Sequence, residues 1–305
     1  MQDIYWIDKT RARASFGRAA STYDAAAILQ KKVREEMLSR LELVKLQPQF
    51  ILDAGCGTGL ASLALQKQFK SAQVVSLDFA LPMLQKTKQN LRGFQFDQSG
   101  LINALKNFFS AKAQHLICAD IEQLPLADKT FGLIWSNLAI QWCNNLDQAF
   151  QEFYRVLQPE GLLMFSTFGP DTLKELRAAT STEGHTSVNR FIDMHDIGDA
   201  LVRAGFNAPV LDVERFTLTY DDVKSVMQDL KNIGAHNATE GRARGLHGRA
   251  FLVELARKYE TFRQADGKLP ATFEVVYGHA WRGQDKPKNM DGVSPVNFKQ
   301  RSKLA

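Results

Sequence analysis

The chain has 305 residues, of which 45% are hydrophobic, and its formal net charge is +5. This length can bury the core of one large domain or two smaller ones. No apolar run approaches the roughly 20 residues of a membrane-spanning helix, and residues 1–13 lack the apolar core of a secretion signal, so we expect a cytoplasmic protein without membrane contact. Cys56, Cys118 and Cys143 lack the paired spacing of a disulfide framework or a zinc site, so we expect no metal.

The N-terminal part of the chain is predicted to cover a ligand site. Residues 9–24 form a basic segment with a helix start signal at Ser21 or Thr22, and residues 25–46 carry apolar side chains at helical spacing. Tyr23 precedes the glycine-rich part of the chain and is a candidate to close over a ligand. The alternative for Tyr23 is ordinary helix packing.

A glycine-rich turn follows. Residues 50–52 are an apolar run typical of a buried strand, which ends in Asp53. Three glycines then alternate at Gly55, Gly57 and Gly59, and a helical pattern begins at once. This order brings bare backbone and free N–H groups to a ligand. The third glycine of a dinucleotide motif is replaced by Leu60, which disfavours a nicotinamide site. A turn without any ligand remains the alternative.

Two further strands are predicted to end in acidic residues. Residues 73–77 lead to Asp78, about twenty positions after the glycines, where a nucleotide-binding fold places its ribose ligand. The alternative for Asp78 is a cap for the following helix. Residues 115–119 lead to Asp120, whose carboxylate can accept an adenine N–H, while the backbone N–H of Ile121 meets a ring nitrogen.

The fourth predicted strand points to the reacting group. Residues 131–136 lead to Asn137, Gln141 and Trp142, and strand ends in a parallel sheet line the ligand crevice. These three residues are therefore candidates for the pocket near a transferred group, although Trp142 could equally pack in the core. Residues 92–113 are predicted to be a surface insertion.

The alternation of strands and helices over residues 25–168 predicts a doubly wound α/β sheet of the Rossmann-like kind. Beyond it we expect a helical lid, a strand over residues 210–220, and an antiparallel edge strand over residues 271–280. The predicted domain division has four parts: residues 1–48 (basic segment and helix over the active site), 49–168 (cofactor-binding core), 169–282 (substrate-binding lid and last strands) and 283–305 (polar, disordered tail).

The spacing Asp-x-Gly-x-Gly-x-Gly resembles the first motif of class I S-adenosylmethionine-dependent methyltransferases. More specifically, the chain resembles the malonyl-[acyl-carrier protein] O-methyltransferases of biotin synthesis over residues 10–282. Four phrases carry the resemblance: residues 16–20 with Tyr23, 52–57, 135–143, and 233–235 leading to 240–242.

The resemblance implies transfer of the S-adenosylmethionine methyl group to the free carboxylate of malonyl-acyl-carrier protein or malonyl-CoA, giving the ester that starts pimeloyl synthesis. It assigns catalysis to Tyr23, Asn137 and Trp142. It assigns cofactor binding to Asp53, Gly55, Gly57, Gly59, Asp78, Phe79, Asp120, Ile121 and Asn137. It assigns substrate binding to Tyr23, Gln141, Trp142, Arg190 and Arg242. The alternative for each arginine is a surface salt bridge.

The implied partner is an acidic acyl carrier protein, and we expect a monomer that binds no nucleic acid. A nucleic-acid methyltransferase is a rival, but the Asn/Asp-Pro-Pro-aromatic motif typical of base methylation is replaced here by residues 136–139, Ser-Asn-Leu-Ala. Two further rivals would share the fold: a methyltransferase for another small molecule, and a non-catalytic assembly factor.

Overall fold

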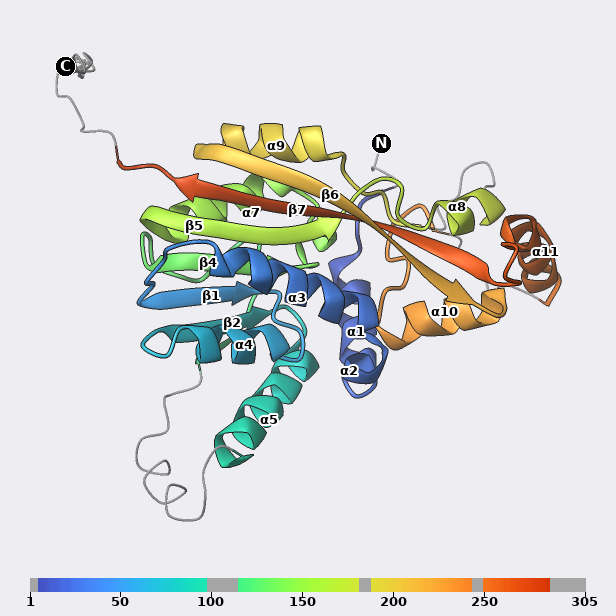
Figure 1. Ribbon diagram of the computed structural model, residues 1–305, viewed down its shortest axis with the longest axis horizontal. Helices are drawn as coiled ribbons and strands as arrows, with labels where there is room; N and C mark the ends of the chain where they lie inside the picture. The colour runs from blue at the N-terminus through green and yellow to red at the C-terminus, as the bar shows by residue number, and fades with distance from the viewer. Residues whose placement is uncertain (1–4, 98–114, 181–187, 243–248, 286–305) are drawn as a thin grey trace, which may run out of the picture.

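The computed structural model describes residues 5–97, 115–180, 188–242 and 249–285 (Figure 1). Its centre is one sheet of seven strands in the order β3-β2-β1-β4-β5-β7-β6. Five strands are parallel: β1 (Phe50–Ala54), β2 (Gln73–Asp78), β3 (His115–Cys118), β4 (Phe131–Asn137) and β5 (Leu157–Phe168). This arrangement confirms the predicted doubly wound α/β fold.

Helices cover both faces of the sheet because the strands are apolar on both sides. Ile51 packs with the helices α3 (Ile28–Glu42) and α4 (Leu60–Gln68) on one face, whereas its neighbour Leu52 packs with α7 (Leu146–Val156) and α9 (Met194–Arg203) on the other. The helix α5 (Leu81–Asp97) follows β2. Residues 92–97 of the predicted insertion thus continue a helix, and the rest of the insertion lies outside the described residues.

We expected the antiparallel strand over residues 271–280 to form the edge of the sheet, and this position is wrong: the strand lies one position in from the edge. β7 (Leu269–Arg282) runs antiparallel to β5, but β6 (Phe206–Tyr220) pairs along its other side and forms the edge. The burial pattern gives the physical reason: β7 is buried on both faces along nearly its whole length, as an inner strand must be, whereas β6 alternates with exposed residues.

The N-terminal basic segment is itself a helix, which the sequence pattern did not reveal. The helix α1 (Lys9–Ala19) begins after Asp8, whose carboxylate accepts the backbone N–H of Arg11 at 3.0 Å. The short helix α2 (Tyr23–Ala26) follows, with Thr22 at its start as predicted. No helix in the described ranges is long and apolar enough to cross a membrane.

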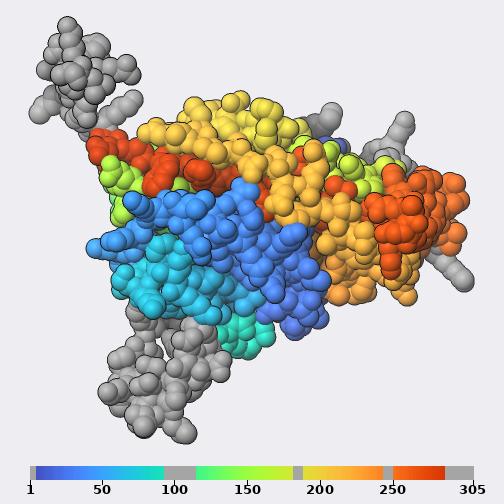
Figure 2. Space-filling model, in the orientation of Figure 1, coloured from blue at the N-terminus to red at the C-terminus, as the bar shows by residue number. Residues whose placement is uncertain are grey.

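Three helices gather at the end of the molecule toward which β1 and β6 point (Figure 1). They are α8 (Lys174–Thr180), α10 (Val223–Asn232) and α11 (Arg249–Tyr259), the last followed by the short helix η2 (Glu260–Phe262). In Figure 2 the blue N-terminal helices adjoin the orange segment that contains α10. The Thr22 hydroxyl donates to the Asn232 carbonyl at 3.1 Å across this contact. We call α8, α10 and α11 the lid.

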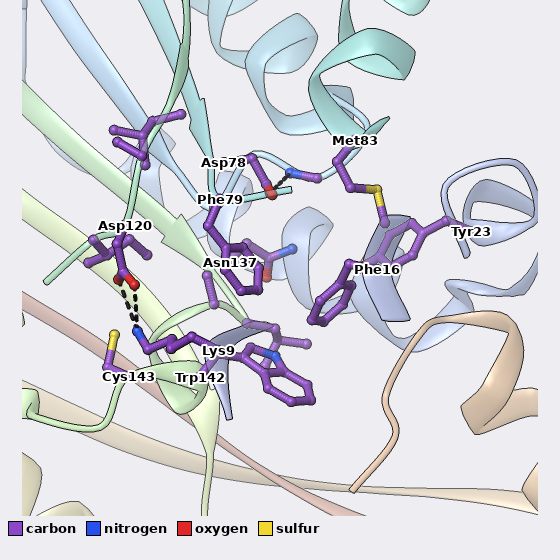
Figure 3. Close-up of a pocket in the computed structure, with 17 residues that line it drawn as sticks. Lys9, Phe16, Tyr23, Asp78, Phe79, Met83, Asp120, Asn137, Trp142 and Cys143 are labelled. Carbon is purple, nitrogen blue, oxygen red and sulfur yellow. Dashed lines mark hydrogen bonds and ion pairs between the residues drawn. The ribbon is translucent and has the colours of Figure 1, made fainter. Parts of the chain in front are cut away.

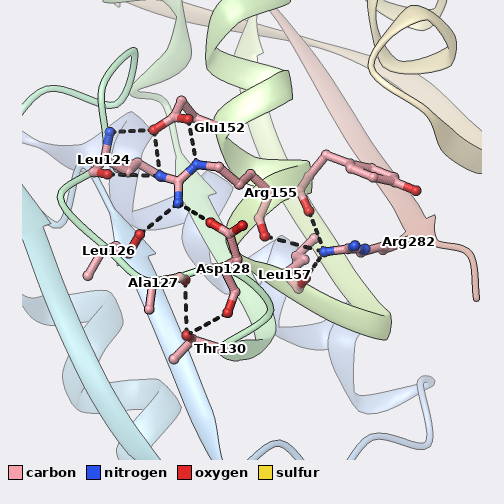
Figure 4. Close-up of polar contacts among 10 residues, drawn as sticks. Leu124, Leu126, Ala127, Asp128, Thr130, Glu152, Arg155, Leu157 and Arg282 are labelled. Atoms are coloured by element: carbon pink, nitrogen blue, oxygen red, sulfur yellow. Dashed lines mark hydrogen bonds and ion pairs between the residues drawn. The ribbon is translucent and has the colours of Figure 1, made fainter. Parts of the chain in front are cut away.

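Two arginines, Arg155 and Arg282, donate hydrogen bonds to backbone carbonyls around α7 (Figure 4). Arg155 donates to the carbonyls of Leu124 and Leu126 at 2.9 and 2.7 Å, and so fixes the loop between β3 and β4. Arg282, at the end of β7, donates to the carbonyls of Tyr154 at 3.0 Å and of Leu157. Arg282 is 5% exposed, so it donates to these carbonyls away from solvent.

We expect Arg282→Met to lower the free energy of unfolding by about 1–3 kcal/mol, because buried carbonyl groups lose their donor. Denaturant unfolding of the ligand-free protein measures this change. Arg203→Met is the matched control, since Arg203 forms an exposed pair with Asp147 and its loss should change stability little. Equal effects of the two substitutions would contradict the buttressing role.

Candidate active site

A cavity lies at the carboxyl ends of the parallel strands, and we call it the donor pocket (Figure 3). Most of the predicted site residues line it: Tyr23, Gly55, Gly57, Asp78, Phe79, Asp120, Ile121, Asn137 and Trp142. Its open volume is about 60 Å³, and Lys9 and Phe16 of α1 also line it.

The glycine turn presents bare backbone to this pocket. All three glycines have positive φ, and a β-carbon on Gly57 (φ +55°) would meet only the Tyr23 ring, at 4.0 Å. By contrast, a β-carbon on Gly55 would lie 2.2 Å from Ala139, and one on Gly59 would lie 2.5 Å from Thr87. Close packing therefore requires Gly55 and Gly59, and Gly59 does not line the pocket. Open space for a ligand lies in front of Gly57.

Asp78 joins the glycine turn to the next helix. Its carboxylate accepts the backbone N–H of Gly57 at 2.9 Å and that of Ala80 at 2.8 Å. Burial raises its pKa to about 6, although the backbone donors of Ala80, Gly57 and Phe79 oppose the rise. The group is therefore ionised at neutral pH. The contact with Ala80, at the start of α5, agrees with the helix-start alternative, and the carboxylate also lines the pocket.

Asp53 lies elsewhere. It is buried within β1 and accepts a hydrogen bond from the Ser62 hydroxyl at 2.5 Å, and Ser62 in turn lies 2.7 Å from the Ser76 hydroxyl. Burial raises the Asp53 pKa to about 7. Asp53 is not among the residues lining the donor pocket. The structure thus places it behind the glycine turn, where it ties α4 to β1.

Lys9 was not identified from the sequence. Its ammonium nitrogen lies 2.9 Å from both carboxylate oxygens of Asp120 (Figure 3). It also pairs with the carboxylate of Glu122. Asp120, the predicted adenine ligand, is therefore already engaged by the helix that covers the pocket. The one sequence signal for Lys9 was Asp8, a helix-start residue that sets the register of α1.

The segment before α1 also contacts the lid side of the molecule. The N–H of Asp8 donates to the Ala238 carbonyl at 2.8 Å, and the N–H of Glu240 donates to the Trp6 carbonyl at 2.8 Å. Asn144 holds Ile7 from the sheet side, through bonds of 2.7 and 3.0 Å. We call residues 5–9 the N-terminal strap, because they connect the loop after α10 to the donor pocket.

A second cavity of about 510 Å³ lies under the lid, and we call it the acceptor chamber. Gln141 and Arg242 line it, as predicted for substrate-binding residues. Arg190 does not line it; its guanidinium lies 5.7 Å from the Tyr5 ring, beside a third cavity. We predicted from the sequence that both arginines bind the same substrate. In the structure they line two different cavities.

The donor pocket and the acceptor chamber share one wall, made of Phe16, Tyr23, Leu138 and Trp142. The Phe16 and Trp142 rings meet edge to face, with centroids 5.0 Å apart. Burial, with the nearby Asp78 and Asp24, raises the pKa of the Tyr23 hydroxyl above its usual range, so this group stays protonated and can donate a hydrogen bond.

Leu138 and Asn137 shape this wall from the end of β4. Leu138 has a φ of +49°, which is uncommon for a branched residue, and its N–H donates to the Ser166 carbonyl at 3.1 Å. Asn137 donates to the Gln30 carbonyl at 3.2 Å and accepts the Ser166 hydroxyl at 2.9 Å. Strained backbone held by such bonds is frequent at functional sites.

Comparison with known proteins adds sequence relatives to this geometry. The family described as "Methyltransferase domain" matches residues 52–165. A malonyl-[acyl-carrier protein] O-methyltransferase of Methylovorus sp. (strain MP688) is 62% identical over 98% of this chain and 98% of that protein. A protein of the same name from Laribacter hongkongensis (strain HLHK9) is 52% identical with the same coverage. A crystal structure of a candidate methyltransferase from Bacillus halodurans C-125 has a TM-score of 0.56 at 17% identity, covering 82% of this chain and 99% of that one, which supports the fold alone.

We expect Gly57→Ala to weaken S-adenosylmethionine binding by at least about tenfold, because the new methyl group would occupy open pocket space. Calorimetric titration measures the loss. Gly267→Ala is the matched control: Gly267 has a similar φ of +80°, but nothing lies within 4 Å of its β-carbon position. Both variants bear the backbone cost of a positive φ, so equal donor affinity in the two would contradict a ligand at Gly57.

The raised pKa of Asp78 gives two opposite pH trends. Protonation removes negative charge and acceptor capacity from the carboxylate, so donor affinity should fall as the pH drops below about 6. The folded pKa values of Asp78 and Asp53 lie above the value of about 4 for an unfolded aspartate, so stability of the ligand-free protein should be lost as pH rises from about 4 to 7. Calorimetric titrations and melting curves at pH 5 and pH 8 test both trends. If donor affinity still fell below pH 6 in an Asp78→Asn variant, the pH dependence would not come from Asp78.

Proposed function

The chain belongs to the malonyl-[acyl-carrier protein] O-methyltransferase family, and we propose that it transfers a methyl group from S-adenosylmethionine to the free carboxylate of a malonyl group held on acyl carrier protein. The observation that carries the proposal is the wall shared by the donor pocket and the acceptor chamber. Because the same four side chains border both cavities, substrates bound in the two cavities can approach each other there for direct transfer. The product would be the neutral methyl ester from which pimeloyl synthesis starts.

The donor pocket suits an adenosyl group. Asp78 is ionised and placed to accept hydrogen bonds from ribose hydroxyls, while Gly57 leaves backbone open to the ligand. Asp120 and Ile121, just after β3, line the pocket and are our candidates for contact with the adenine ring, and Phe79 lines the same space. When bound, S-adenosylmethionine supplies an electrophilic methyl group carried on a sulfonium.

The acceptor carboxylate needs little chemical activation. A free carboxylic acid has a pKa of about 4, so at neutral pH it is already the nucleophile and no strong general base is required. The tasks left to the protein are alignment of the two reactants and exclusion of water, and alignment alone can lower a barrier by about 7–11 kcal/mol. Tyr23 and Trp142 stand at the shared wall, and Asn137 supports it from β4.

The acceptor anion needs a cation that reaches the chamber. Arg242 lines the chamber and spends one N–H on the Thr239 carbonyl at 2.8 Å, which leaves the rest of its guanidinium for a carboxylate. Arg190 faces the third cavity instead. We therefore assign carboxylate orientation to Arg242, with Gln141 as a neighbouring polar group of the chamber lining.

An assay with labelled S-adenosylmethionine and malonyl-carrier protein tests the proposal, and the expected product is a base-labile methyl ester. Arg242→Gln should lower kcat/KM by about 10–100-fold, the effect of losing a charge-assisted contact. Arg190→Gln is the matched control and should change kcat/KM far less. Label found only on another acceptor, or equal losses in the two variants, would contradict the substrate or the arginine assignment respectively.

A further inference from the structure

The charged side chains that line the acceptor chamber are all basic, among the residues that the structure describes. Among its described lining residues there is no aspartate or glutamate, whereas Arg11, Lys231 and Arg242 all line it. Arg11 and Lys231 are exposed, so they mark the end of the chamber that opens to solvent. In the described part of the chain, neither residue forms an ion pair with a carboxylate. A chamber built in this way favours a ligand with negative charge near its mouth.

Arg18 and His236 extend this charge into a cluster. Arg11 and Arg18 are seven residues apart on α1 and hence lie on one face of the helix. His236 is close enough to Arg18, Arg11 and Lys231 that these cations add to burial in lowering its pKa. We call Arg11, Arg18, Lys231 and His236 the basic rim. Its members come from α1, the last turn of α10 and the loop after it.

The backbone between α10 and His236 fixes the rim. Gly234 has a φ of +73°, and a β-carbon there would lie 3.2 Å from both the Phe16 backbone and the Ala19 side chain. Only a glycine lets the loop pack this closely on α1. The N–H of Ala235 donates to the Leu230 carbonyl at 2.9 Å, which closes the end of α10. The backbone that leads to His236 is therefore fixed against α1, the helix that carries Arg11 and Arg18.

We propose that the basic rim binds the phosphodiester of the phosphopantetheine arm that carries the malonyl group. This inference rests on the proposed function. A malonyl thioester on such an arm is anionic at two separate points, the free carboxylate and the phosphodiester, with an uncharged stretch between them. The chamber offers the same three features: it meets the donor pocket at the shared wall, has apolar lining residues such as Phe168, Leu230 and Leu255, and includes Arg11, Lys231 and His236 of the basic rim in its lining.

The arm with its phosphate occurs in both the carrier protein and coenzyme A, so the rim recognises a chemistry common to the two. Free phosphopantetheine and pantetheine differ by the phosphate alone, and both can be tested as inhibitors of malonyl-carrier methylation. For the wild-type protein we expect phosphopantetheine to inhibit at a concentration at least about tenfold lower than pantetheine, as one charge-assisted site would give. In Arg11→Gln/Arg18→Gln the ratio should approach 1.

The double variant Lys45→Gln/Arg92→Gln is the control, because it removes two exposed positive charges outside the rim and should keep the wild-type ratio. A ratio near 1 in the wild type, or an unchanged ratio in Arg11→Gln/Arg18→Gln, would overturn the proposal. So would a loss of activity confined to malonyl-carrier protein with malonyl-CoA unaffected, which would indicate contact with the carrier's own surface. Failure of the proposed function is distinct: no malonyl thioester would then be methylated.

Discussion

The geometry of the donor pocket depends on one buried anion, the carboxylate of Asp78. It accepts N–H groups from the glycine turn after β1 and from the start of α5, so it fixes two connections that would otherwise move independently. Burial makes this charge unfavourable, and the backbone donors compensate only in part, since the pKa is still raised to about 6. These bonds hold the turn in the conformation in which Gly55 and Gly57 line the pocket.

The contact between the two cavities depends on β4 and on α1, which are far apart in the sequence. β4 supplies Leu138, whose unusual backbone angle is held by Ser166 on the neighbouring strand. α1 supplies Phe16, which packs on Trp142. The lid then closes the acceptor side. The central parallel sheet therefore fixes one part of the shared wall, and the helices α1 and α2 supply the rest of it.

The sequence predicted the central sheet well, since strands buried on both faces read as apolar runs and end in recognisable acids. It could not distinguish Asp53 from Asp78. β1 continues to Ala54, so Asp53 lies within the strand on the face covered by α4, whereas Asp78 ends its strand. Lys9 was missed because α1 has no clear apolar periodicity. Arg190 and Arg242 were inseparable for another reason: their positions depend on loop paths that only tertiary packing determines.

The N-terminal strap has a practical consequence. Through Trp6 and Asp8 it pairs with the backbone of the loop that carries Arg242, and through Lys9 it reaches Asp120. A change that displaces the strap would therefore disturb the borders of both cavities together. The last described strand, β7, ends at the opposite end of the molecule from the lid (Figure 1). Purification handles and immobilisation chemistry therefore belong at the carboxyl end of this enzyme.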